Sequence, residues 1–417
     1  MVGTALAFFR VPPPDRGILW AEDGATFVSE AYGHNPLVLF EPYSGYLHIF
    51  PRLGAALATL FPVDLVPMVV TVIAALLTGA VATAVYLFAR LRLHSHVLPV
   101  VLWLDVAILP VAGGEVTDSI ANSHWYLIFG ALWAVLVTPR STRLIVLQGI
   151  VLAFAILSDP LTLVATGPFV LIRIFSLPRW RAQVVTIVYL SAAVVQGIGT
   201  VAGTVFGHGR TVSGSLPLLP GFLEIYGSRV TMGSVVGING TTVLLHAFGI
   251  AALIAMMVLV FVAISAVIIV DAHRRTLVLA FSATSLVLSV LTFTLVWGAL
   301  DLAGPLGLEV GGRYMVVPTL CLFSAIILSF DSLLERMPHL SARTAVAAAL
   351  LVAVAVIGAQ DYRVWTDRAE APRWSDSLDD ATLACSDGGA TGGLAAIAPV
   401  GFAPVGVPCD VLLGRHQ

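Results

Sequence analysis

Long apolar runs alternate with short polar connections along this chain. Four runs are long enough to cross a bilayer, since a membrane-spanning helix needs about 20 apolar residues; they cover residues 67–89, 183–203, 243–270 and 276–300. Shorter runs lie near residues 97–112, 124–138, 144–158, 160–176, 315–330 and 344–359. Short runs are typical of helices that tilt, end early or line a polar cavity. The pattern predicts an all-α integral membrane protein, a polytopic bundle of about 10–11 transmembrane helices.

Composition supports a membrane protein and excludes several functions. The 417 residues are 58% hydrophobic and 11% charged, whereas soluble domains carry about 25% charged residues. The net charge is −3, and the chain has no basic tract, which excludes a nucleic-acid partner. Every basic residue other than histidine is arginine. Without lysine, the chain has neither a P-loop nor a Schiff-base nucleophile.

The arginines predict how the chain is oriented in the membrane. They gather in every second connection, at Arg90 and Arg92, Arg140 and Arg143, Arg173, Arg179 and Arg181, Arg274 and Arg275, and Arg336 and Arg343. Short arginine-bearing connections mark the cytoplasmic side. The opposite loops hold nearly all of the acids, so we expect them, and the tail, to face the periplasm or the exterior of a plasma (inner) membrane.

Three regions follow from this pattern. Residues 1–66 comprise nine apolar residues, which are too few to cross a bilayer, followed by an outer loop with interfacial helices. We expect these nine to be the end of a first span that is cut short; the alternative is an N-terminus that lies outside. Residues 67–359 form the transmembrane bundle, and residues 360–417 form a small periplasmic C-terminal tail.

The cysteines add one expectation for the tail. Three cysteines are too few for a disulfide scaffold or a structural zinc site. Cys321 lies in an apolar run and is expected in the core. Cys385 and Cys409 both lie in the polar tail, where a disulfide between them is expected if the tail faces an oxidising compartment.

The first outer loop carries two adjacent acids, Glu22 and Asp23, in the stretch ILWAEDGATF. Adjacent like charges repel and retain water, so they add little to fold stability. One hypothesis is that the pair performs chemistry at the membrane surface, with Asp23 as the catalytic base and Glu22 as the neighbour that raises its pKa. The alternative is that both acids stabilise the first turn of an interfacial helix that begins near Ala25.

Other outer loops supply candidate substrate-binding residues. These are His48 and Arg52 in EPYSGYLHIFPRL, Glu115, Asp118 and His124 in GGEVTDSIANSHWYL, and Arg313 and Tyr314 in LEVGGRYMVVP. The acids have an alternative role as solvated loop residues, the histidines as hydrogen-bonded interfacial residues, and Arg52 as a headgroup anchor. We expect acids from two loops and an arginine from a third to converge above one outer cavity.

These motifs resemble those of the GT-C glycosyltransferases, polytopic enzymes that use polyprenyl-phosphate sugars as donors. That class carries an acidic residue or pair in its first outer loop, matching Glu22 and Asp23. Many members have an acid in the second outer loop, as Glu115 or Asp118 could be, and a late arginine before a span, matching Arg313 and Tyr314. The resemblance covers residues 1–360 and implies transfer of a sugar to an envelope glycan, glycolipid or protein acceptor.

The residue chemistry fits such a transfer. The reaction needs a base for the acceptor hydroxyl, and a partly desolvated carboxylate is suited to that task. It also needs a positive group for the departing phosphate, for which the arginine fork is suited. No cofactor is certain, and a divalent cation, Mg²⁺ or Mn²⁺, stays open.

Other functions remain as alternatives. A transporter or flippase for a lipid-linked sugar would place polar residues near the membrane midplane and often repeats one half of its fold. An O-antigen-type ligase or polymerase relies on a large late outer loop, whereas the acid pair of this chain comes first. A non-catalytic scaffold is the third alternative.

Overall fold

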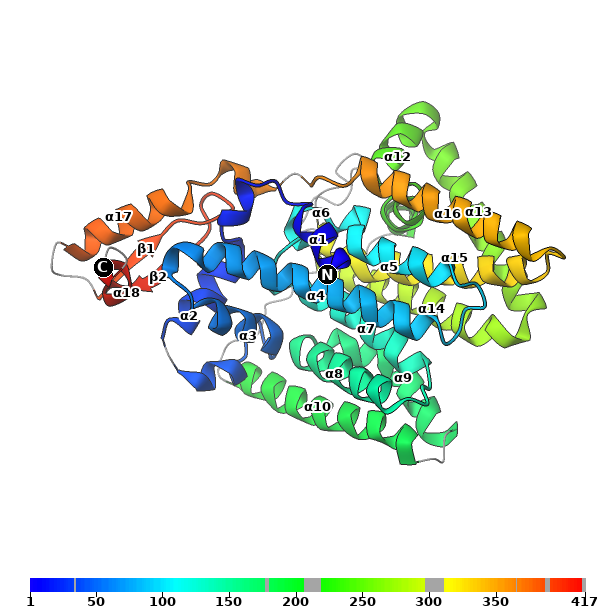
Figure 1. Cartoon of the computed structure of the whole chain (residues 1–417), viewed down its shortest axis with the longest axis horizontal. Coiled ribbons are helices and arrows are strands. Elements are labelled where there is room, and N and C mark those ends of the chain that lie inside the picture. Colours follow the sequence, from blue (N-terminus) through cyan, green and yellow to red (C-terminus); the bar gives the residue numbers. More distant parts are fainter. Residues whose placement is uncertain are drawn as a thin grey trace.

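A helical bundle, with almost no sheet, makes up the computed structural model of the protein (Figure 1). The structure describes residues 1–33, 35–176, 180–205, 219–296, 311–364, 366–386 and 391–414. Eight segments of these residues are apolar and long enough to cross a membrane. They contain α4 (Val66–Ala89), α5 (Leu98–Ile108), α10 (Trp180–Val205), α11 (Leu219–Ile225) with α12 (Gly233–Phe248), α13 (Ile250–Val270), α14 (Ala272–Val296), α15 (Val316–Glu335) and α16 (Leu340–Gln360). The all-α architecture with many apolar helices is therefore confirmed, whereas the described residues contain eight such segments and not the number of about 10–11 that the sequence pattern predicts.

Shorter elements connect or extend these helices. They are α1 (Val2–Phe8), η1 (Asp15–Gly17), η2 (Asp23–Val28), α2 (Ser29–Ala31), η3 (Pro36–Phe40), α3 (Ile49–Ala58), η4 (Val63–Leu65), η5 (Pro110–Ala112), α6 (Gly113–Val116), η6 (Ala121–Ser123), α7 (His124–Leu136), α8 (Thr142–Ser158), α9 (Leu161–Ser176), η7 (Tyr226–Met232) and η8 (Gly312–Met315). The short apolar runs of the sequence are thus helices, as expected.

Helix α7 is buried along nearly its whole length and ends inside the bundle. The last carbonyl groups of a helix have no partner within the helix. Here side chains supply the partners: Gln148 Nε2 donates to Ala134 O at 2.6 Å, and Arg92 Nη2 donates to Leu136 O at 2.7 Å. Arg173 Nη1 also donates to the carbonyl oxygen of residue 137, at 2.8 Å. The positive charges of Arg92 and Arg173 at this C-terminal end also interact favourably with the helix dipole.

One predicted span, residues 243–270, is wrong as a single helix. The chain breaks at Gly249, whose φ of 56° is accessible to glycine at little cost, so the run is divided between α12 and α13. A second glycine, Gly237, with a φ of 72°, kinks α12. The final residues of the predicted 276–300 span lie outside the described residues.

Several basic connections meet at one end of the bundle, which we call the arginine end. Arg274 Nη2 donates to Asp331 Oδ2 at 2.6 Å, and its Nη1 donates to Asp271 and Glu335, each at 2.8 Å. Arg274 Nη2 also lies 2.7 Å from His94 Nδ1. These contacts hold the connections after α4, α13 and α15 at the same end, as the arginine pattern predicts. Arg179 lies outside the described residues.

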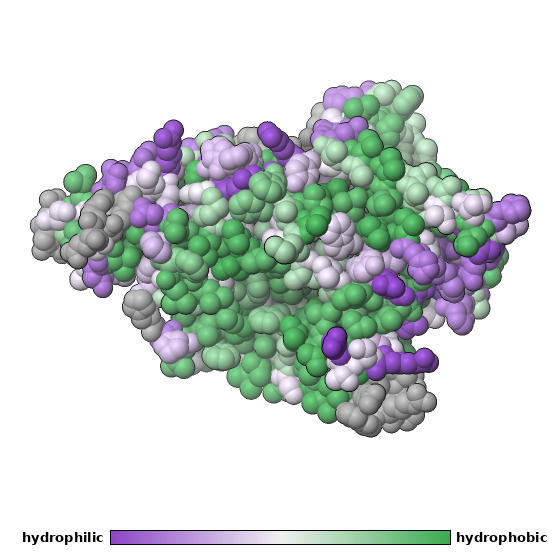
Figure 2. All heavy atoms as spheres, viewed as in Figure 1, coloured by the Kyte–Doolittle hydropathy of each residue, from purple (hydrophilic) through white to green (hydrophobic). Residues whose placement is uncertain are grey.

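The surface between the two ends is apolar. Figure 2 shows hydrophobic residues across the middle of one face and hydrophilic residues toward its two ends. The N-terminus lies beside the middle of α4 (Figure 1). There α1 packs so closely that a Cβ on Gly79 would lie 2.5 Å from Thr4 Oγ1. The first apolar residues therefore belong to the bundle.

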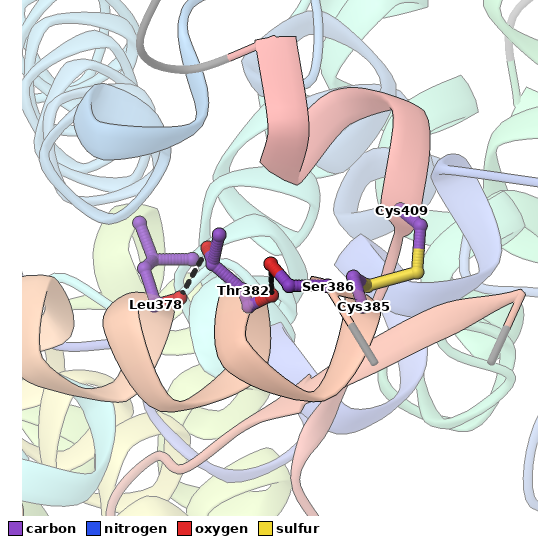
Figure 3. Close-up of a disulfide and its surroundings, with 5 residues drawn as sticks. All are labelled: Leu378, Thr382, Cys385, Ser386 and Cys409. Carbon is purple, nitrogen blue, oxygen red and sulfur yellow. Dashed lines mark hydrogen bonds between the residues drawn. A yellow bond between two sulfur atoms is a disulfide. The ribbon is translucent and has the colours of Figure 1, made fainter. Parts of the chain in front are cut away.

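The opposite end, which we call the tail end, carries the C-terminal segment. It contains η9 (Asp367–Glu370), α17 (Trp374–Ser386), β1 (Gly392–Ala395), β2 (Val405–Pro408) and α18 (Cys409–Gly414), with β1 and β2 paired antiparallel. The expected disulfide joins Cys385 at the end of α17 to Cys409 at the start of α18, with their Cα atoms 5.5 Å apart (Figure 3). Cys321 is buried, as expected.

The tail is attached to the first loop by backbone pairing. The amide of Ala398 donates to Leu19 O at 3.0 Å, and the amide of Ala21 donates to Ala398 O at 2.6 Å. A Cβ on Gly24 would lie 2.8 Å from Val405 Cγ2, so the start of η2 rests directly on β2. The tail thus fixes the backbone on both sides of the Glu22–Asp23 pair.

The disulfide is expected to hold this tail in place. Replacing both Cys385 and Cys409 with serine should lower the stability of the tail by about 3 kcal/mol, because the unfolded segment regains loop freedom. Limited proteolysis should then cleave the segment 391–414 faster than in the parent protein. Cys321→Ala is the control. Equal cleavage rates in the parent and the double variant would contradict this role.

Candidate functional site

The two adjacent acids of the first loop point into different surroundings. Asp23 is 0% exposed, whereas Glu22 is partly exposed and lines a cavity of about 230 Å³. Ala21, which precedes them, has a φ of 38°, a value uncommon for a residue with a side chain. The hydrogen bond that its backbone amide donates to Ala398 O holds this conformation. The backbone bend at Ala21 thus helps to direct Glu22 into the cavity and Asp23 into the buried interior.

The Asp23 carboxylate binds the second loop. It accepts hydrogen bonds from the amide of Ala121 at 2.7 Å, from Ser119 Oγ at 3.2 Å and from the amide of Ile120 at 3.3 Å. Burial raises the pKa of Asp23 to about 7, although the Ala121 amide opposes that shift. Asp23 is not among the residues that line the cavity. Its contacts therefore link the two loops.

The cavity at Glu22 lies between four parts of the chain. They are the first loop, the second loop, the N-terminal turn of α7 and η8, and they contribute Glu22, His48, Asn122, His124, Arg313 and Tyr314 among others. Asn122 is held in place by its Nδ2, which donates to Glu115 O at 2.8 Å. The expected convergence therefore occurs in part: an acid of the first loop and the late arginine line one cavity, whereas neither acid of the second loop, Glu115 or Asp118, lines it.

Aromatic rings form much of the cavity wall. His48 stacks on Tyr46 with ring centroids 4.2 Å apart and meets the edge of Tyr43 at 5.4 Å. On the other side, Trp125 and Tyr314 meet edge to face at 5.7 Å. Apolar and aromatic walls with a few directed polar groups are typical of small-molecule sites. The rings of the wall are mostly buried and pack against one another, which fixes the shape of the cavity.

The two histidines of the cavity are held by hydrogen bonds. Burial lowers the pKa of His48 to about 3, so the ring is neutral, and its Nδ1 lies 3.1 Å from Tyr46 O. His124 lies with Nδ1 2.7 Å from Ala121 O and Nε2 3.2 Å from Asp159 Oδ2. Among the described residues, no group of three or more His, Cys, Asp or Glu side chains is placed to hold a metal ion.

Arg313 lies opposite the first loop and close to Glu115. Its Nε is 3.8 Å from Glu115 Oε2, which is too long for a hydrogen bond. The guanidinium lies over the Tyr314 ring, 5.0 Å from the ring centroid. Gly312 allows η8 to approach η5, since a Cβ there would lie 2.9 Å from Val111 O. The glycine therefore brings Arg313 close to the second loop.

Three of the predicted binding residues do not line this cavity: Glu115, which contacts Arg313 beside it, and Arg52 and Asp118, which lie away from it. Arg52 is buried and forms an ion pair with Glu30, so it joins α3 to α2. Asp118 is buried as well, and its carbonyl oxygen accepts from Arg368 Nη2 at 3.2 Å. Burial raises the pKa of Asp118 to about 7. Neither side chain is among those that line the cavity.

Asp159 is a site residue that the sequence analysis missed. It follows α8, is buried, and holds the imidazole of His124 by the contact given above. Burial raises its pKa to about 7. The signal in the sequence was a single acid between two short apolar runs, which is also the composition of an ordinary connection.

No family model matches the chain, and no curated protein matches it either. The assignment of a function therefore depends on the geometry of this cavity and on the motifs that form it.

The buried position of Asp23 predicts a pH effect on stability. Its pKa is higher in the folded protein than in the unfolded chain, so the folded state binds the proton more tightly. The stabilisation that this proton binding gives to the folded state is complete below about pH 4 and is lost as the pH rises toward 7. Asn at this position does not titrate. The stability of the parent relative to Asp23→Asn should therefore fall between these pH values.

Thermal unfolding of both proteins in the same detergent, measured from pH 4 to pH 8, tests this expectation. Comparing the two proteins cancels the titration of Asp118 and Asp159, which both retain. Parallel pH profiles would show that Asp23 titrates as it does in the unfolded chain.

Proposed function

We propose that this protein is a membrane glycosyltransferase that transfers a sugar from a polyprenyl-phosphate donor to an envelope glycan, glycolipid or protein acceptor. The observation that carries the proposal is the aromatic cavity at the tail end, which Glu22 and Arg313 both line. A carboxylate and a guanidinium beside aromatic walls are the groups that a sugar transfer from a phosphate requires. The resemblance of the loop motifs to GT-C enzymes agrees with this chemistry.

In the proposed reaction, the oxygen of an acceptor hydroxyl attacks the anomeric carbon of the donor sugar. A new carbon–oxygen bond forms as the bond from the anomeric carbon to the phosphate oxygen breaks, and the electron pair of the broken bond goes to the phosphate. Glu22 takes the proton of the hydroxyl. Arg313 binds the phosphate, which leaves with its lipid.

The geometry favours Glu22 over Asp23 as the base. A base must come within hydrogen-bond distance of the proton that it takes. Glu22 lines the cavity, whereas the oxygens of Asp23 accept from Ser119 and from backbone amides of the second loop. The role expected for Asp23 from the sequence becomes a positioning role in this proposal.

The tail end is proposed to face the periplasm or the exterior, with the arginine end in the cytoplasm. Arginine-rich connections favour the cytoplasmic side, and the Cys385–Cys409 disulfide suits an oxidising compartment. A polyprenyl-phosphate donor would place its phosphate at the membrane surface beside Arg313. A divalent cation bound with that phosphate, Mg²⁺ or Mn²⁺, remains part of the proposal.

The transporter alternative receives less support from this arrangement. A transporter places its polar binding site near the midplane between two halves of the fold. In the part of the chain that the structure describes, the cavity with the converging polar and aromatic groups lies at the tail end, formed by loops.

Glu22→Gln should lower transfer by about 10²–10⁴-fold, because the amide cannot accept the proton of the hydroxyl. The measurement is glycolipid and glycan analysis of a deletion strain complemented with each variant, followed by rates in purified membranes. Glu41→Gln, an exposed acid of the same loop, is the matched control. A Glu22→Gln protein that restores the missing sugar at the parental rate would exclude Glu22 as the base.

Arg313→Lys should lower transfer by roughly tenfold or more, because lysine keeps the charge but lacks the planar fork that binds phosphate through two hydrogen bonds. The same assay, at varied donor concentration, should show weaker use of the donor. Arg140→Lys, at an exposed arginine of another connection, controls for the substitution itself. Parental kinetics in Arg313→Lys would contradict phosphate binding by the fork.

A further inference from the structure

A second cavity, of about 250 Å³, lies next to the first. Its walls come from the second loop, from the kink of α12 and from the segment after α16, and its polar residues include Glu115, Asn239, Arg363, Thr366 and Asp367. Its size is close to the ~300 Å³ lower end of small-molecule pockets. The donor and the residues that act on it in the proposed reaction lie in the first cavity.

The two cavities share one wall. Glu115 lines the second cavity and Arg313 lines the first, with Nε and Oε2 3.8 Å apart. Neither of these two atoms has a hydrogen-bond partner among the described residues. The two side chains are 26% and 29% exposed as a whole, whereas these two atoms are themselves buried. The 3.8 Å separation is too short to hold an atom between them, so a polar group could hydrogen-bond to both only from beside the pair, after the side chains shift.

The chemistry of the second cavity disfavours an anionic ligand. The kink at Gly237 starts a new helical segment whose first amides would attract an anion, but Asp361 already accepts from Ile238 N at 2.9 Å and Asn239 N at 3.1 Å. The remaining charged groups of the wall are the carboxyls of Glu115 and Asp367 and the exposed guanidinium of Arg363. A phosphate would meet more negative than positive charge here.

Uncharged hydroxyl groups fit these walls better. Carboxylates accept hydrogen bonds from hydroxyls, guanidinium groups donate to them, and an asparagine side chain can do both; the buried hydroxyl of Thr366 already donates to Asp15. The main chain at Gly113 and Gly114 has no side chain to fill the space beside Glu115. The cavity therefore offers several directed polar groups to a polyhydroxylated molecule.

We propose that the second cavity binds the acceptor, as an uncharged, hydroxyl-rich glycan end. This inference rests on the proposed glycosyltransferase function and assigns the two substrates to separate cavities. The donor sugar and phosphate occupy the aromatic cavity with Arg313. The reacting hydroxyl of the acceptor reaches the anomeric carbon at the boundary of the two cavities, beside the Glu115 and Arg313 side chains, where its proton goes to Glu22.

The test separates cleavage of the donor from transfer to the acceptor. The parent and its variants are placed in lipid nanodiscs with lipid-linked sugars that are extracted from the deletion strain and labelled in the sugar. One measurement is release of free sugar, in which water replaces the acceptor. The other is incorporation of label into the glycans of membranes from the same strain.

The double variant Arg363→Gln with Asp367→Asn removes two charges of the second cavity. Incorporation should fall by roughly tenfold, the effect of losing about 1.4 kcal/mol of binding, while release of free sugar stays at the parental rate. Arg373→Gln with Asp380→Asn, two exposed residues near or on α17, is the matched control. Glu22→Gln should lower both activities.

A second variant blocks the cavity physically, so that its effect on incorporation does not depend on the strength of single hydrogen bonds. Asp367→Cys, modified by a bulky maleimide, should lose incorporation and keep release of free sugar, and Asp380→Cys with the same reagent should keep both. Failure of the thiol at position 367 to react would contradict an accessible cavity.

The other possible outcomes would each overturn the assignment of the second cavity to the acceptor. Parental incorporation in the double variant and in the blocked protein would overturn it. A parallel fall of both activities would assign the second cavity to the donor and overturn it as well. If the parent neither releases nor transfers sugar, the proposed function itself fails and the acceptor assignment fails with it.

Discussion

The buried carboxylate of Asp23 is the interaction on which the arrangement of the site depends. A carboxylate without exposure to water needs hydrogen-bond donors or a proton, and here the donors come from the second loop at Ser119, Ile120 and Ala121. Because these residues lead directly into α7, the same contact fixes the start of α7 and the position of His124. The first loop and the second loop therefore cannot move independently, and Glu22 is held at their junction.

Backbone strain is concentrated around this junction. Ala21, Ser44 and Asp118 are the residues with side chains that have a positive φ in the described part of the chain. Each such conformation costs about 1–3 kcal/mol and persists where the surroundings fix it. The tail fixes Ala21 through Ala398, and Arg368 fixes Asp118 through its carbonyl oxygen. The C-terminal segment thus stabilises strained backbone in two loops, which explains why a tail without catalytic groups matters to the site.

The sequence predicts the helices well and the roles of the acids poorly. Apolar length alone is enough for α4 and α10, because a helix must be long enough to cross the bilayer. The break at Gly249 was missed because glycine is common in membrane helices and a positive φ leaves no other mark. Neighbouring acids cannot be told apart by sequence, since the fold decides that Asp23 is buried and Glu22 faces the cavity. Arg52 illustrates the same limit, because its partner Glu30 is 22 residues away in the chain.

The two ends of the bundle differ in how completely their charges are paired. At the arginine end, Arg274 donates to three carboxylates, and the amides of residues 94 and 95 donate to Asp331 as well. At the tail end, Glu115 Oε2 and Arg313 Nε face each other at 3.8 Å without hydrogen-bond partners. Leaving polar atoms unpaired in a buried place costs about 1–3 kcal/mol each, and such atoms occur at the arginine end as well, where Arg274 Nε has no hydrogen-bond partner among the described residues. What distinguishes the Glu115–Arg313 contact is its place, because its two side chains line neighbouring cavities.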